Sequence, residues 1–482
     1  MNSHFKLLLV VPNFRWNAQD ARVMWHITPY NLCLLAAMVE DFCQVTVLDA
    51  YAFDLSPEDF SSRVAQLNPD LVGISVMMDQ CAPAGHRAAS LVKAVVPSVP
   101  VLLGGVYPTV NPERALEDES VDLVIVGEGE YVLPEIVQHY LNGSPLPDQG
   151  VCLRENGQIV NHGRAPLIDD VDALPLPAYH YIDYARYSNS ASRKSVDSPP
   201  EFPYARILTS RGCPQKCNFC QVDRISGRKF RARSPENVLN EIAWLKQDYG
   251  IRSLIFDDDN LFANKKRAMA IFQGMLDQGL AMPWKAISTA VFHLDEELLG
   301  LMAESGCQYI DVAIESGTER VLKEIIQKPV SLEYAKKMVK AARDLGIYVA
   351  ANFIVGFPTE TWDEIRQTIA FSEELQADYV KIFNAIPLRH TRLWEQCEEV
   401  GAFKEGFDVD QITWFAGQIS TEHFTPDELT VLRAFEWERI NFATAEKQKR
   451  TAEIMKISVD ELYEIRRNTL TSAIQQLRMS GK

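Results

Sequence analysis

The segment Ser210-Arg-Gly-Cys-Pro-Gln-Lys-Cys-Asn-Phe-Cys220 is the most informative stretch of the chain. It spaces Cys213, Cys217 and Cys220 in the pattern CxxxCxxC, and the aromatic Phe219 precedes the last cysteine. Three thiolates on one short loop can hold three corners of a 4Fe-4S cube, which leaves the fourth iron open for an exogenous ligand. The spacing therefore predicts an iron–sulfur cluster.

Two other interpretations of these cysteines remain. A closed structural zinc site needs four ligands, but no fourth Cys or His lies nearby, and the closest histidines are His180 and His293. Incidental buried cysteines are the second alternative. The chain has nine cysteines and no recognisable export signal, so we expect a reducing, cytoplasmic compartment in which clustered cysteines indicate metal binding and not disulfides.

From residue 205 to about 394, apolar strand runs alternate with helix-period segments. Ser234 and Pro235 mark the start of one helix and Gly250 its end. Six βα repeats are too few for a closed eight-stranded barrel, so we expect a partial (β/α)6 TIM-type barrel whose site lies at the C-terminal strand ends. The expected strands are 205–209, 253–256, 285–288, 309–314, 348–354 and 379–383.

The first 140 residues also alternate strand and helix patterns, which predicts a Rossmann-like, doubly wound parallel sheet. The expected strands are 6–11, 45–49, 70–75, 101–103 and 122–126, and the expected helices include 57–67 and 84–95. Ligands of such α/β sheets bind outside the carboxyl ends of the strands. The residues expected there are Pro12, Asn13, Ser75, Val76, Gly104, Gly105, Gly127, Glu128 and Gly129.

The whole chain has 482 residues, which suggests about three domains. We expect a sheet domain (1–143), a Pro-rich linker without a strong period (144–200), the barrel (201–395) and a helical cap (396–482) with helices at 426–449 and 459–477. The net charge is −17, which disfavours nucleic-acid and anionic-lipid partners. No apolar run approaches the ~20 residues that span a bilayer.

With its cysteine loop, the region from about Ala205 to Trp394 resembles the radical S-adenosylmethionine (SAM) superfamily. Phe256-Asp-Asp-Asp-Asn260, Ala313-Ile-Glu-Ser-Gly317 and Asn352-Phe-Ile-Val-Gly-Phe-Pro-Thr-Glu360 follow the expected strands in the order of that superfamily. Each motif alone is weak, and Glu-Ser-Gly could be an ordinary helix start. The resemblance implies SAM contacts by Phe219, Asp257, Asp258, Asn260, Glu315, Ser316, Asn352, Val355 and Gly356.

The N-terminal region resembles the cobalamin-binding domain fused to many of these enzymes. The matching segments are Asp70-Leu-Val-Gly-Ile-Ser75, Leu103-Gly-Gly-Val-Tyr-Pro-Thr109 and Val126-Gly-Glu-Gly-Glu130, and they add Val106 and Tyr107 to the expected cobalamin contacts. A generic Rossmann-like domain, or one that keeps the fold without the cofactor, is the alternative. The absence of GxGxxG after the first strand argues against a dinucleotide.

This region departs from the mutase-type pattern in two places. It has no Asp-x-His-x-x-Gly segment, so we expect no protein histidine beneath the cobalt. His26 is the only histidine in the corresponding loop, and we favour a structural or lower-face polar role for it over a role as a cobalt ligand. Tyr107 stands where relatives often have His. The remaining histidines His86, His139 and His423 are interpreted as surface or helix residues.

Arg389 and His390 are the candidate catalytic residues, since they follow the sixth barrel strand at the open mouth. They could bind an anionic substrate group or transfer a proton, or form a solvated turn. Trp414 and Trp437 could close the pocket, although burial in the core is the favoured interpretation.

The resemblance implies reductive cleavage of SAM to a 5′-deoxyadenosyl radical, hydrogen abstraction from an unactivated carbon, and methyl transfer from methylcobalamin to a small molecule. It also implies an external electron donor such as flavodoxin or ferredoxin. The alternatives are rearrangement, cyclisation or oxidation without methyl transfer, and a non-catalytic carrier. The strand-end Asp257, Glu315 and Asn352 argue against a carrier, which has no use for a SAM pocket.

Overall fold

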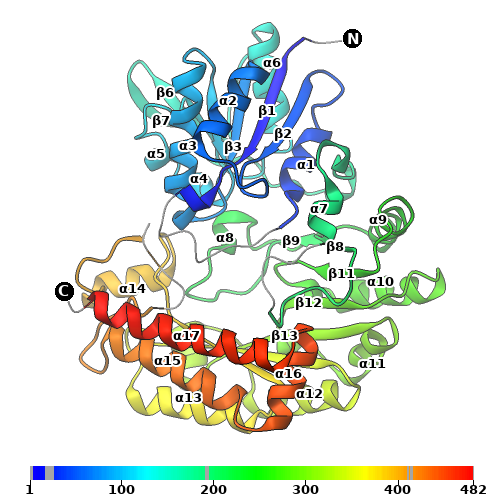
Figure 1. Ribbon diagram of the computed structural model, residues 1–482, viewed down its shortest axis with the longest axis vertical. Helices are drawn as coiled ribbons and strands as arrows, with labels where there is room; N and C mark the ends of the chain where they lie inside the picture. Colours follow the sequence, from blue (N-terminus) through cyan, green and yellow to red (C-terminus); the bar gives the residue numbers. More distant parts are fainter. Residues whose placement is uncertain (1–3, 17–26, 190–194, 410–411, 413–415, 481–482) are drawn as a thin grey trace. The chain divides into compact units, whose positions relative to one another are not determined.

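A computed structural model describes residues 4–16, 27–189, 195–409, 412 and 416–480. The chain divides into two compact units. Unit 1 comprises residues 1–192, 223–227 and 409–411, and unit 2 comprises 193–222, 228–408 and 412–482 (Figure 1). Each unit is built around its own sheet, and the two are described separately.

The sheet of unit 1 has seven strands in the described part of the chain, in the order β2-β1-β3-β4-β5-β6-β7. The first five are parallel, with β1 between β2 and β3, and this order confirms the doubly wound architecture. The strands are β1 (Lys6–Val11), β2 (Gln44–Asp49), β3 (Leu71–Ser75), β4 (Val101–Gly104), β5 (Leu123–Ile125), β6 (Val151–Glu155) and β7 (Gln158–Asn161).

The hairpin β6–β7 lies within the segment that the sequence predicted to be a linker without periodic structure. β6 pairs antiparallel with β5, and β7 pairs antiparallel with β6, so residues 151–161 extend the sheet. These strands have five and four residues, which is too short for a clear alternating pattern. The prediction of a linker without a strong period did not include this hairpin.

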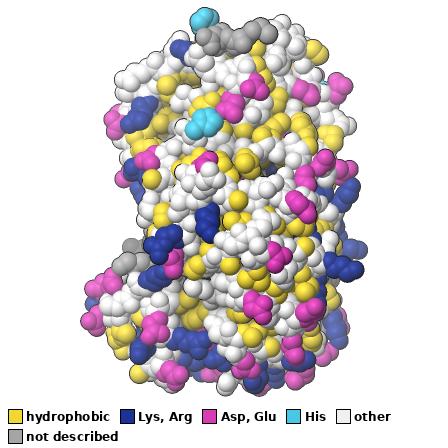
Figure 2. All heavy atoms as spheres, turned by 90° about the vertical axis from the view of Figure 1, so that its right-hand side faces the viewer, with side chains coloured by type: hydrophobic (Ala, Val, Ile, Leu, Met, Phe, Trp, Pro, Cys, Tyr) yellow, Lys and Arg dark blue, Asp and Glu magenta, His cyan; other side chains and the backbone are white. Residues whose placement is uncertain are grey.

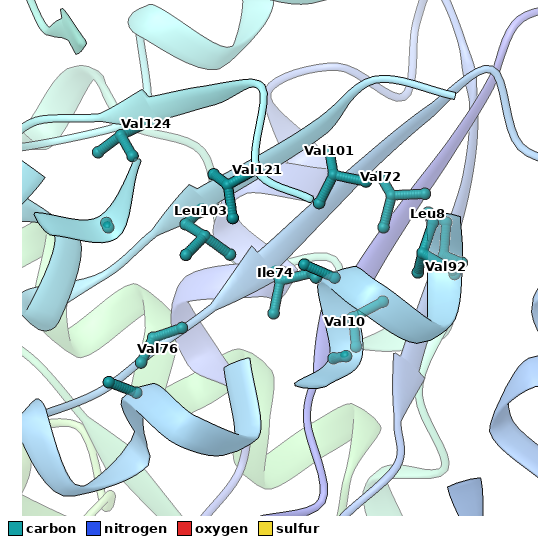
Figure 3. Close-up of a cluster of buried hydrophobic side chains, with 14 of the residues drawn as sticks. Leu8, Val10, Val72, Ile74, Val76, Val92, Val101, Leu103, Val121 and Val124 are labelled. Atoms are coloured by element: carbon teal, nitrogen blue, oxygen red, sulfur yellow. The ribbon is translucent and has the colours of Figure 1, made fainter. Parts of the chain in front are cut away.

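Both faces of this sheet are apolar and covered by helices. Leu8, Val10, Val72 and Ile74 face α2 and α3 in one cluster of buried side chains, drawn in Figure 3. Leu7 and its neighbours on the opposite face pack against α1 and α6. The helices of this unit are α1 (Tyr30–Ala37), α2 (Pro57–Leu67), α3 (Ala82–Val95), α4 (Val106–Val110), α5 (Pro112–Ala115), α6 (Val132–Asn142) and α7 (Tyr184–Ser188).

The sheet of unit 2 contains six parallel strands of the described chain, in the order β15-β14-β13-β12-β11-β8. Because β8 and β15 stay at the edges and do not pair with each other, the barrel is partial, as predicted. The strands are β8 (Tyr204–Ile207), β11 (Ser253–Phe256), β12 (Trp284–Thr289), β13 (Cys307–Glu315), β14 (Tyr348–Val355) and β15 (Tyr379–Asn384).

Helices follow the strands of this sheet with the expected caps. Ser234 accepts a hydrogen bond from the Asn237 amide, and Pro235 is the first residue of its helix. These helices are α9 (Pro235–Asp248), α10 (Lys265–Asp277), α11 (Glu296–Glu304), α12 (Leu332–Asp344), α13 (Trp362–Glu374) and α14 (Arg392–Val400). The short strands β9 (Ser210–Arg211) and β10 (Arg231–Ala232) pair antiparallel, and α8 (Val222–Ile225) lies between them in the sequence.

Charged side chains occupy the interior of unit 2. Lys381 Nζ lies 2.5 Å from carboxylate oxygens of both Asp197 and Asp311, and the Tyr309 hydroxyl donates to Asp197 at 3.0 Å. Lys285 Nζ donates to the Val196 carbonyl at 2.8 Å, and burial lowers the pKa of Lys285 to about 7. These bonds tie the segment before β8 to three barrel strands.

The C-terminal region is helical, as predicted, but one expected helix is two. α15 (Pro426–Asn441) ends at Asn441, and α16 (Ala445–Met455) begins after three further residues, with Thr444 as its cap. Trp437 is half-buried against Phe442, and its Nε1 donates to Tyr379 on β15, so it belongs to the core; Trp414 lies outside the described residues. The last helix is α17 (Val459–Ser480).

The surface carries both signs of charge. On the face drawn in Figure 2, acidic and basic side chains are interspersed with apolar ones. Among the described residues, no helix is long and apolar enough to cross a membrane.

Candidate active site

The three loop cysteines follow β9 at the carboxyl edge of the barrel sheet. All are free and half-buried, and burial raises the pKa of the Cys217 thiol to about 11 and of the Cys220 thiol to about 12. In the described part of the chain, no three potential ligands converge on a point where one metal ion could sit. A 4Fe-4S cube fits this arrangement better than a single ion, because each thiolate binds its own iron.

Carboxylates that follow β11 fasten the start of the cysteine loop. Asp258 Oδ1 accepts hydrogen bonds from the Thr209 amide (3.2 Å), the Thr209 hydroxyl (2.7 Å) and the Ser210 hydroxyl. Asp259 accepts from the Gly212 amide at 3.0 Å, and Gly212 has φ +85°, which a side chain would strain. The backbone is therefore turned toward the cysteines by groups outside the loop.

Three bonds hold the end of the same loop. The Asn218 amide donates to the Ile326 carbonyl (3.0 Å), and the Asn218 carbonyl accepts from the Leu393 amide (2.9 Å). Gln221 Nε2, next to Cys220, donates to the Arg389 carbonyl at 2.8 Å. Segments after β13 and β15 thus position a loop that is 105 or more residues earlier in the chain.

The two aspartates expected to contact SAM bond to protein groups. Asp257 forms a two-pronged ion pair with Arg206, with both N–O distances 2.7 Å. Asp258 is 3% exposed, and burial raises its pKa to about 6. The structure places both beneath the loop as anchors, which the sequence interpretation had not foreseen.

Buried polar atoms without partners mark the strand ends of the described barrel. They include Asp258 Oδ2 and Asn260 Oδ1 after β11, Thr289 Oγ1 at the end of β12, Asn352 Oδ1 within β14, and both side-chain polar atoms of Asn384 at the end of β15. Buried polar groups are ordinarily hydrogen-bonded, so such a set indicates a ligand. The sequence interpretation included Asp258, Asn260 and Asn352 but missed Thr289 and Asn384, which are the last residues of their strands.

Asn260 also reaches the cluster side of the site. Its Nδ2 lies 3.6 Å from Cys213 Sγ and 3.5 Å from His293 Nε2. His293 is half-buried after β12, and burial lowers its pKa. The sequence interpretation did not assign His293 to the site either.

Glu315, the last residue of β13, is paired inside the protein. Lys328 Nζ lies 2.7 Å from Glu315 Oε1, and both side chains are under 10% exposed. Ser316 is fully buried and bonds to Thr318 and Thr368, so its hydroxyl fixes the backbone after the strand.

The turn after β14 is built around Gly356. Its φ is +87°, and a Cβ there would lie 2.4 Å from Leu429 of α15. Glu360 Oε2 accepts from the Gly356 amide (2.6 Å) and the Phe357 amide (3.1 Å), and burial raises the pKa of Glu360 to about 8. Val355 is fully buried, and its carbonyl accepts a hydrogen bond from the Ala385 amide. At this strand end, a ligand would therefore contact the turn at Gly356 and not Val355.

The candidate catalytic residues lie on the turn between β15 and α14. His390 is exposed with φ +62°. The Arg389 guanidinium lies over the Trp394 ring, 5.1 Å from its centroid. The backbone carbonyl of Arg389 accepts a hydrogen bond from Gln221 of the cysteine loop. Phe219 packs near Phe357 with ring centroids 6.4 Å apart, which joins the cysteine loop to the β14 turn.

At the carboxyl edge of the unit 1 sheet, glycines expose backbone. A Cβ on Gly104 would meet no atom within 4 Å, whereas one on Gly105 would lie 2.5 Å from the Val76 carbonyl oxygen. Gly105 has φ +105°, and Met77, just beyond Val76, is an apolar side chain 38% exposed. This open, side-chain-free edge fits a large planar ligand such as the cobalamin ring.

Several of the expected cobalamin contacts have side chains bonded within the protein. Asn13 Nδ2 donates to the Leu55 carbonyl, and Glu128 accepts from the Ile168 amide at 2.7 Å. Val76 and Tyr107 are buried in the sheet core, so their side chains cannot line the edge. Solvent reaches five of the expected contacts at least in part: Ser75, Gly104, Gly105, Val106 and Gly129. Pro12 is buried, and the Gly127 amide donates a hydrogen bond to the Thr109 hydroxyl.

Two histidines of unit 1 that were interpreted as surface or helix residues have partners inside the protein. His86 lies in α3, half-buried between the Tyr107 hydroxyl (3.1 Å) and Asp118 (2.9 Å). His139 bonds to the Ser144 carbonyl. His26 lies outside the described residues, and the absence of a histidine beneath cobalt stays a prediction.

Comparison with known proteins assigns a family to the main domain of each unit. The model of the Radical SAM superfamily matches residues 207–372, and that of the B12 binding domain matches 22–137. An uncharacterized methyltransferase, PH0819 of Pyrococcus horikoshii, is 34% identical over 392 residues, covering 81% of this chain and 82% of the relative. The cytidylyl-2-hydroxyethylphosphonate methyltransferase of Streptomyces wedmorensis is 30% identical over 446 residues, with the same coverage of 81% and 82%.

Among solved structures, the radical SAM methyltransferase TsrM from Kitasatospora setae, with cobalamin and a [4Fe-4S] cluster bound, superposes with a TM-score of 0.66. It is 20% identical and covers 84% of this chain and 76% of its own, so this likeness concerns the fold. From these matches, this chain belongs to the cobalamin-dependent radical SAM methyltransferase family, whose cofactors are a 4Fe-4S cluster, SAM and cobalamin.

Proposed function

We propose that this chain methylates a carbon atom of a small molecule. One observation carries the proposal: the three-cysteine loop stands at the same strand ends as a set of buried polar atoms without protein partners. When bound, the cluster and SAM supply a radical that removes hydrogen from an unactivated carbon, and cobalamin supplies the methyl group.

The residues of unit 2 would bind and orient the reactants. Cys213, Cys217 and Cys220 hold the cluster, and Asn260 donates to the first of these sulfurs. Glu315 takes the ammonium group of SAM, a charge-assisted bond suited to a buried carboxylate. Unpartnered atoms such as Asn352 Oδ1 accept from its hydroxyl or amino groups.

In unit 1, the glycine edge would receive cobalamin through shape and backbone contacts. Gly104 leaves room for a flat ring, and Met77 offers an apolar contact beside it.

The printed names of relatives support a small-molecule substrate. One relative is named for a cytidylyl-hydroxyethylphosphonate, and one K. setae structure holds tryptophan. An external donor such as flavodoxin or ferredoxin would reduce the cluster. All nine cysteines lie in the described part of the chain and none is in a disulfide, which supports a reducing, cytoplasmic compartment.

The test supplies anaerobically reconstituted enzyme with cobalamin, a reductant, SAM carrying a trideuterated methyl group, and a low-molecular-weight extract of the source cells. A methylase yields a product heavier by the labelled methyl, together with S-adenosylhomocysteine and 5′-deoxyadenosine. Formation of 5′-deoxyadenosine with an unlabelled product and no S-adenosylhomocysteine would overturn the proposal.

That second outcome would favour the alternative of rearrangement, cyclisation or oxidation. A specific observation keeps it in view: the anaerobic magnesium-protoporphyrin IX monomethyl ester cyclase of Rubrivivax gelatinosus is 25% identical over 417 residues. It covers 84% of this chain and 72% of the cyclase.

A further inference from the structure

Asn260 connects the cysteine loop to the segment that follows β12. It directly precedes the short helix η6 (Leu261–Ala263) and is only 2% exposed. Its Nδ2 lies 3.6 Å from Cys213 Sγ and 3.5 Å from His293 Nε2, whereas its Oδ1 has no hydrogen-bond partner among the described residues. The nitrogen of this amide therefore faces a cluster ligand, and the oxygen stays available to SAM.

The orientation of this amide follows from the chemistry of its neighbours. An amide nitrogen carries two hydrogens, and here two acceptors lie within its reach, the sulfur of Cys213 and the ring nitrogen of His293. The reverse orientation would place Oδ1 against a cysteine that becomes a thiolate when it binds iron. Two acceptors would then face each other in a buried site, which is unfavourable. Nδ2 is thus the atom that meets Cys213.

His293 is held in place by its own segment. It is the last residue of the short helix η7 (Val291–His293), and its amide donates to the Ala290 carbonyl at 3.0 Å. Burial lowers the pKa of His293, which favours the neutral ring. A neutral ring accepts a hydrogen bond at Nε2 when its proton is on Nδ1. His293 can therefore hold one hydrogen of Asn260 Nδ2, which leaves the other hydrogen for Cys213 Sγ.

A hydrogen bond to a cluster ligand affects the two oxidation states of the cluster differently. In the proposed function, an external one-electron donor of low potential reduces the cluster from the 2+ to the 1+ state, and no proton is transferred. The added negative charge is shared with the cysteine sulfurs. An N–H donor at sulfur therefore stabilises the reduced state more than the oxidised state, and it raises the reduction potential. Burial strengthens this interaction, because little water screens it.

We infer that Asn260 raises the reduction potential of the 4Fe-4S cluster through the hydrogen bond from Nδ2 to Cys213, and that His293 is the positioning residue that directs this hydrogen. The inference rests on the proposed function, in which Cys213 and its two neighbours hold the cluster. His293 contacts neither the cluster nor SAM in this scheme; it acts through Asn260. A cluster with a raised potential is reduced by a weaker electron donor.

The test is an anaerobic redox titration of the full-length, cluster-loaded enzyme without SAM or cobalamin, in which the paramagnetic resonance signal of the reduced cluster is measured against potential. Asn260→Leu keeps the branching of the side chain and removes its N–H groups. It should change the reduction equilibrium constant about tenfold, which lowers the midpoint by about 59 mV, while the iron content equals that of wild type. Gln273→Leu is the control, because it removes an exposed amide of α10 that bonds to Asp277, and its midpoint should be unchanged.

Variants of His293 test the positioning role. His293→Phe keeps a buried ring but has no nitrogen to hold Asn260, so the midpoint should fall by less than in Asn260→Leu. His293→Gln supplies an acceptor again and should bring the midpoint back toward the wild-type value. The double variant Asn260→Leu/His293→Phe should have the midpoint of Asn260→Leu alone, because the histidine acts only through the amide. A further fall in the double variant would contradict the positioning role.

If Asn260→Leu does not load a cluster, Asn260→Ser has a polar side chain too short to reach the sulfur, and its midpoint should also fall. His293→Phe leaves every cluster contact in place and decides the question if both of these variants lose iron. A wild-type midpoint in a variant with full iron content would overturn the inference. A wild-type chain that holds no 4Fe-4S cluster would instead overturn the proposed function, whereas a cluster-loaded chain that transfers no methyl group would overturn the proposed function and leave this inference standing.

Discussion

The two sheets of this protein bury different kinds of side chain. The unit 1 sheet is apolar on both faces, with valines and leucines such as Val10, Val72 and Leu103 against its helices. The unit 2 sheet carries Lys381, Asp311 and other charged groups in its interior. The edges differ in the same way, because one presents glycine backbone and the other presents thiols and amides.

This contrast shows two ways to make a ligand site at strand ends. A large ring needs a surface without side chains, which glycine and a regular apolar core provide. A cluster and a small charged cofactor need specific polar atoms at fixed positions, and these must be held by further polar contacts. The charged interior of unit 2 is thus consistent with a site built from side chains.

Replacement of all three loop cysteines by alanine has the largest expected effect. Cys213→Ala/Cys217→Ala/Cys220→Ala should remove the iron and the charge-transfer absorption completely, since three thiolates bind the cluster. Cobalamin affinity should be unchanged, because the glycine edge belongs to the other unit. Iron assay and cobalamin titration give both values, and full iron content in the variant would contradict the assignment.

Lys381→Met tests the charged interior. The substitution removes the cation from Asp311, which is 5% exposed, and from Asp197, which is 48% exposed. Only the pair with Asp311 is buried, and breaking one buried pair typically costs about 3–5 kcal/mol. Denaturant unfolding monitored in unit 2 measures the loss. Lys340→Met is the control, since Lys340 is 76% exposed and should change stability by under about 1 kcal/mol. Equal losses of unfolding free energy for the two substitutions would show that the interior ion pairs do not stabilise unit 2.

The glycine edge can be tested with adjacent residues. Gly104→Val adds a side chain where Cβ meets no atom within 4 Å, so it should leave the melting midpoint unchanged and reduce cobalamin affinity about tenfold. Gly105→Ala should destabilise the protein by about 1–3 kcal/mol, because of its φ of +105° and the nearby Val76 carbonyl. Cobalamin binding by Gly104→Val at the wild-type level would place the ring elsewhere.

Glu360→Gln has the smallest expected effect and tests the turn of unit 2. The folded pKa of about 8 lies above the unfolded value near 4.3, so the stability from Glu360 is complete below about pH 4 and is lost as pH rises through about 8. Glutamine does not titrate. The melting midpoint of the variant relative to wild type should therefore rise from pH 6 to pH 9, by about 2–4 °C per kcal/mol. A pH-independent difference would show that Glu360 does not titrate there.

Much of the fold could be predicted from the sequence because each strand carries its own apolar run. The range 57–67 matches α2, and the Ser234–Pro235 start matches α9. The hairpin β6–β7 was missed because its strands are short. The helix break at Phe442 was missed because helix-forming residues continue on both sides of it.

Some residues of the candidate site could be predicted from the sequence and others could not. The cysteines were predictable because their spacing is local, within eight residues. The partners of the site were not: Lys328 is 13 residues from Glu315, and His293 is 33 residues from Asn260. Such pairs depend on which strands become neighbours. The roles of Asp257 and Asp258 as anchors likewise depend on where Arg206 and Thr209 lie in the folded barrel.

The anchors of the cysteine loop have a consequence for how the enzyme matures. Asp258, Asp259 and the Arg389 carbonyl hold the loop through amide and hydroxyl groups, and none of these bonds involves a sulfur atom. These bonds could form before the thiols bind iron, so we expect folding and metal insertion to be separate events. A cell could complete the polypeptide under iron starvation and load it later, and a cluster lost to oxygen could be rebuilt on the same molecule without refolding it.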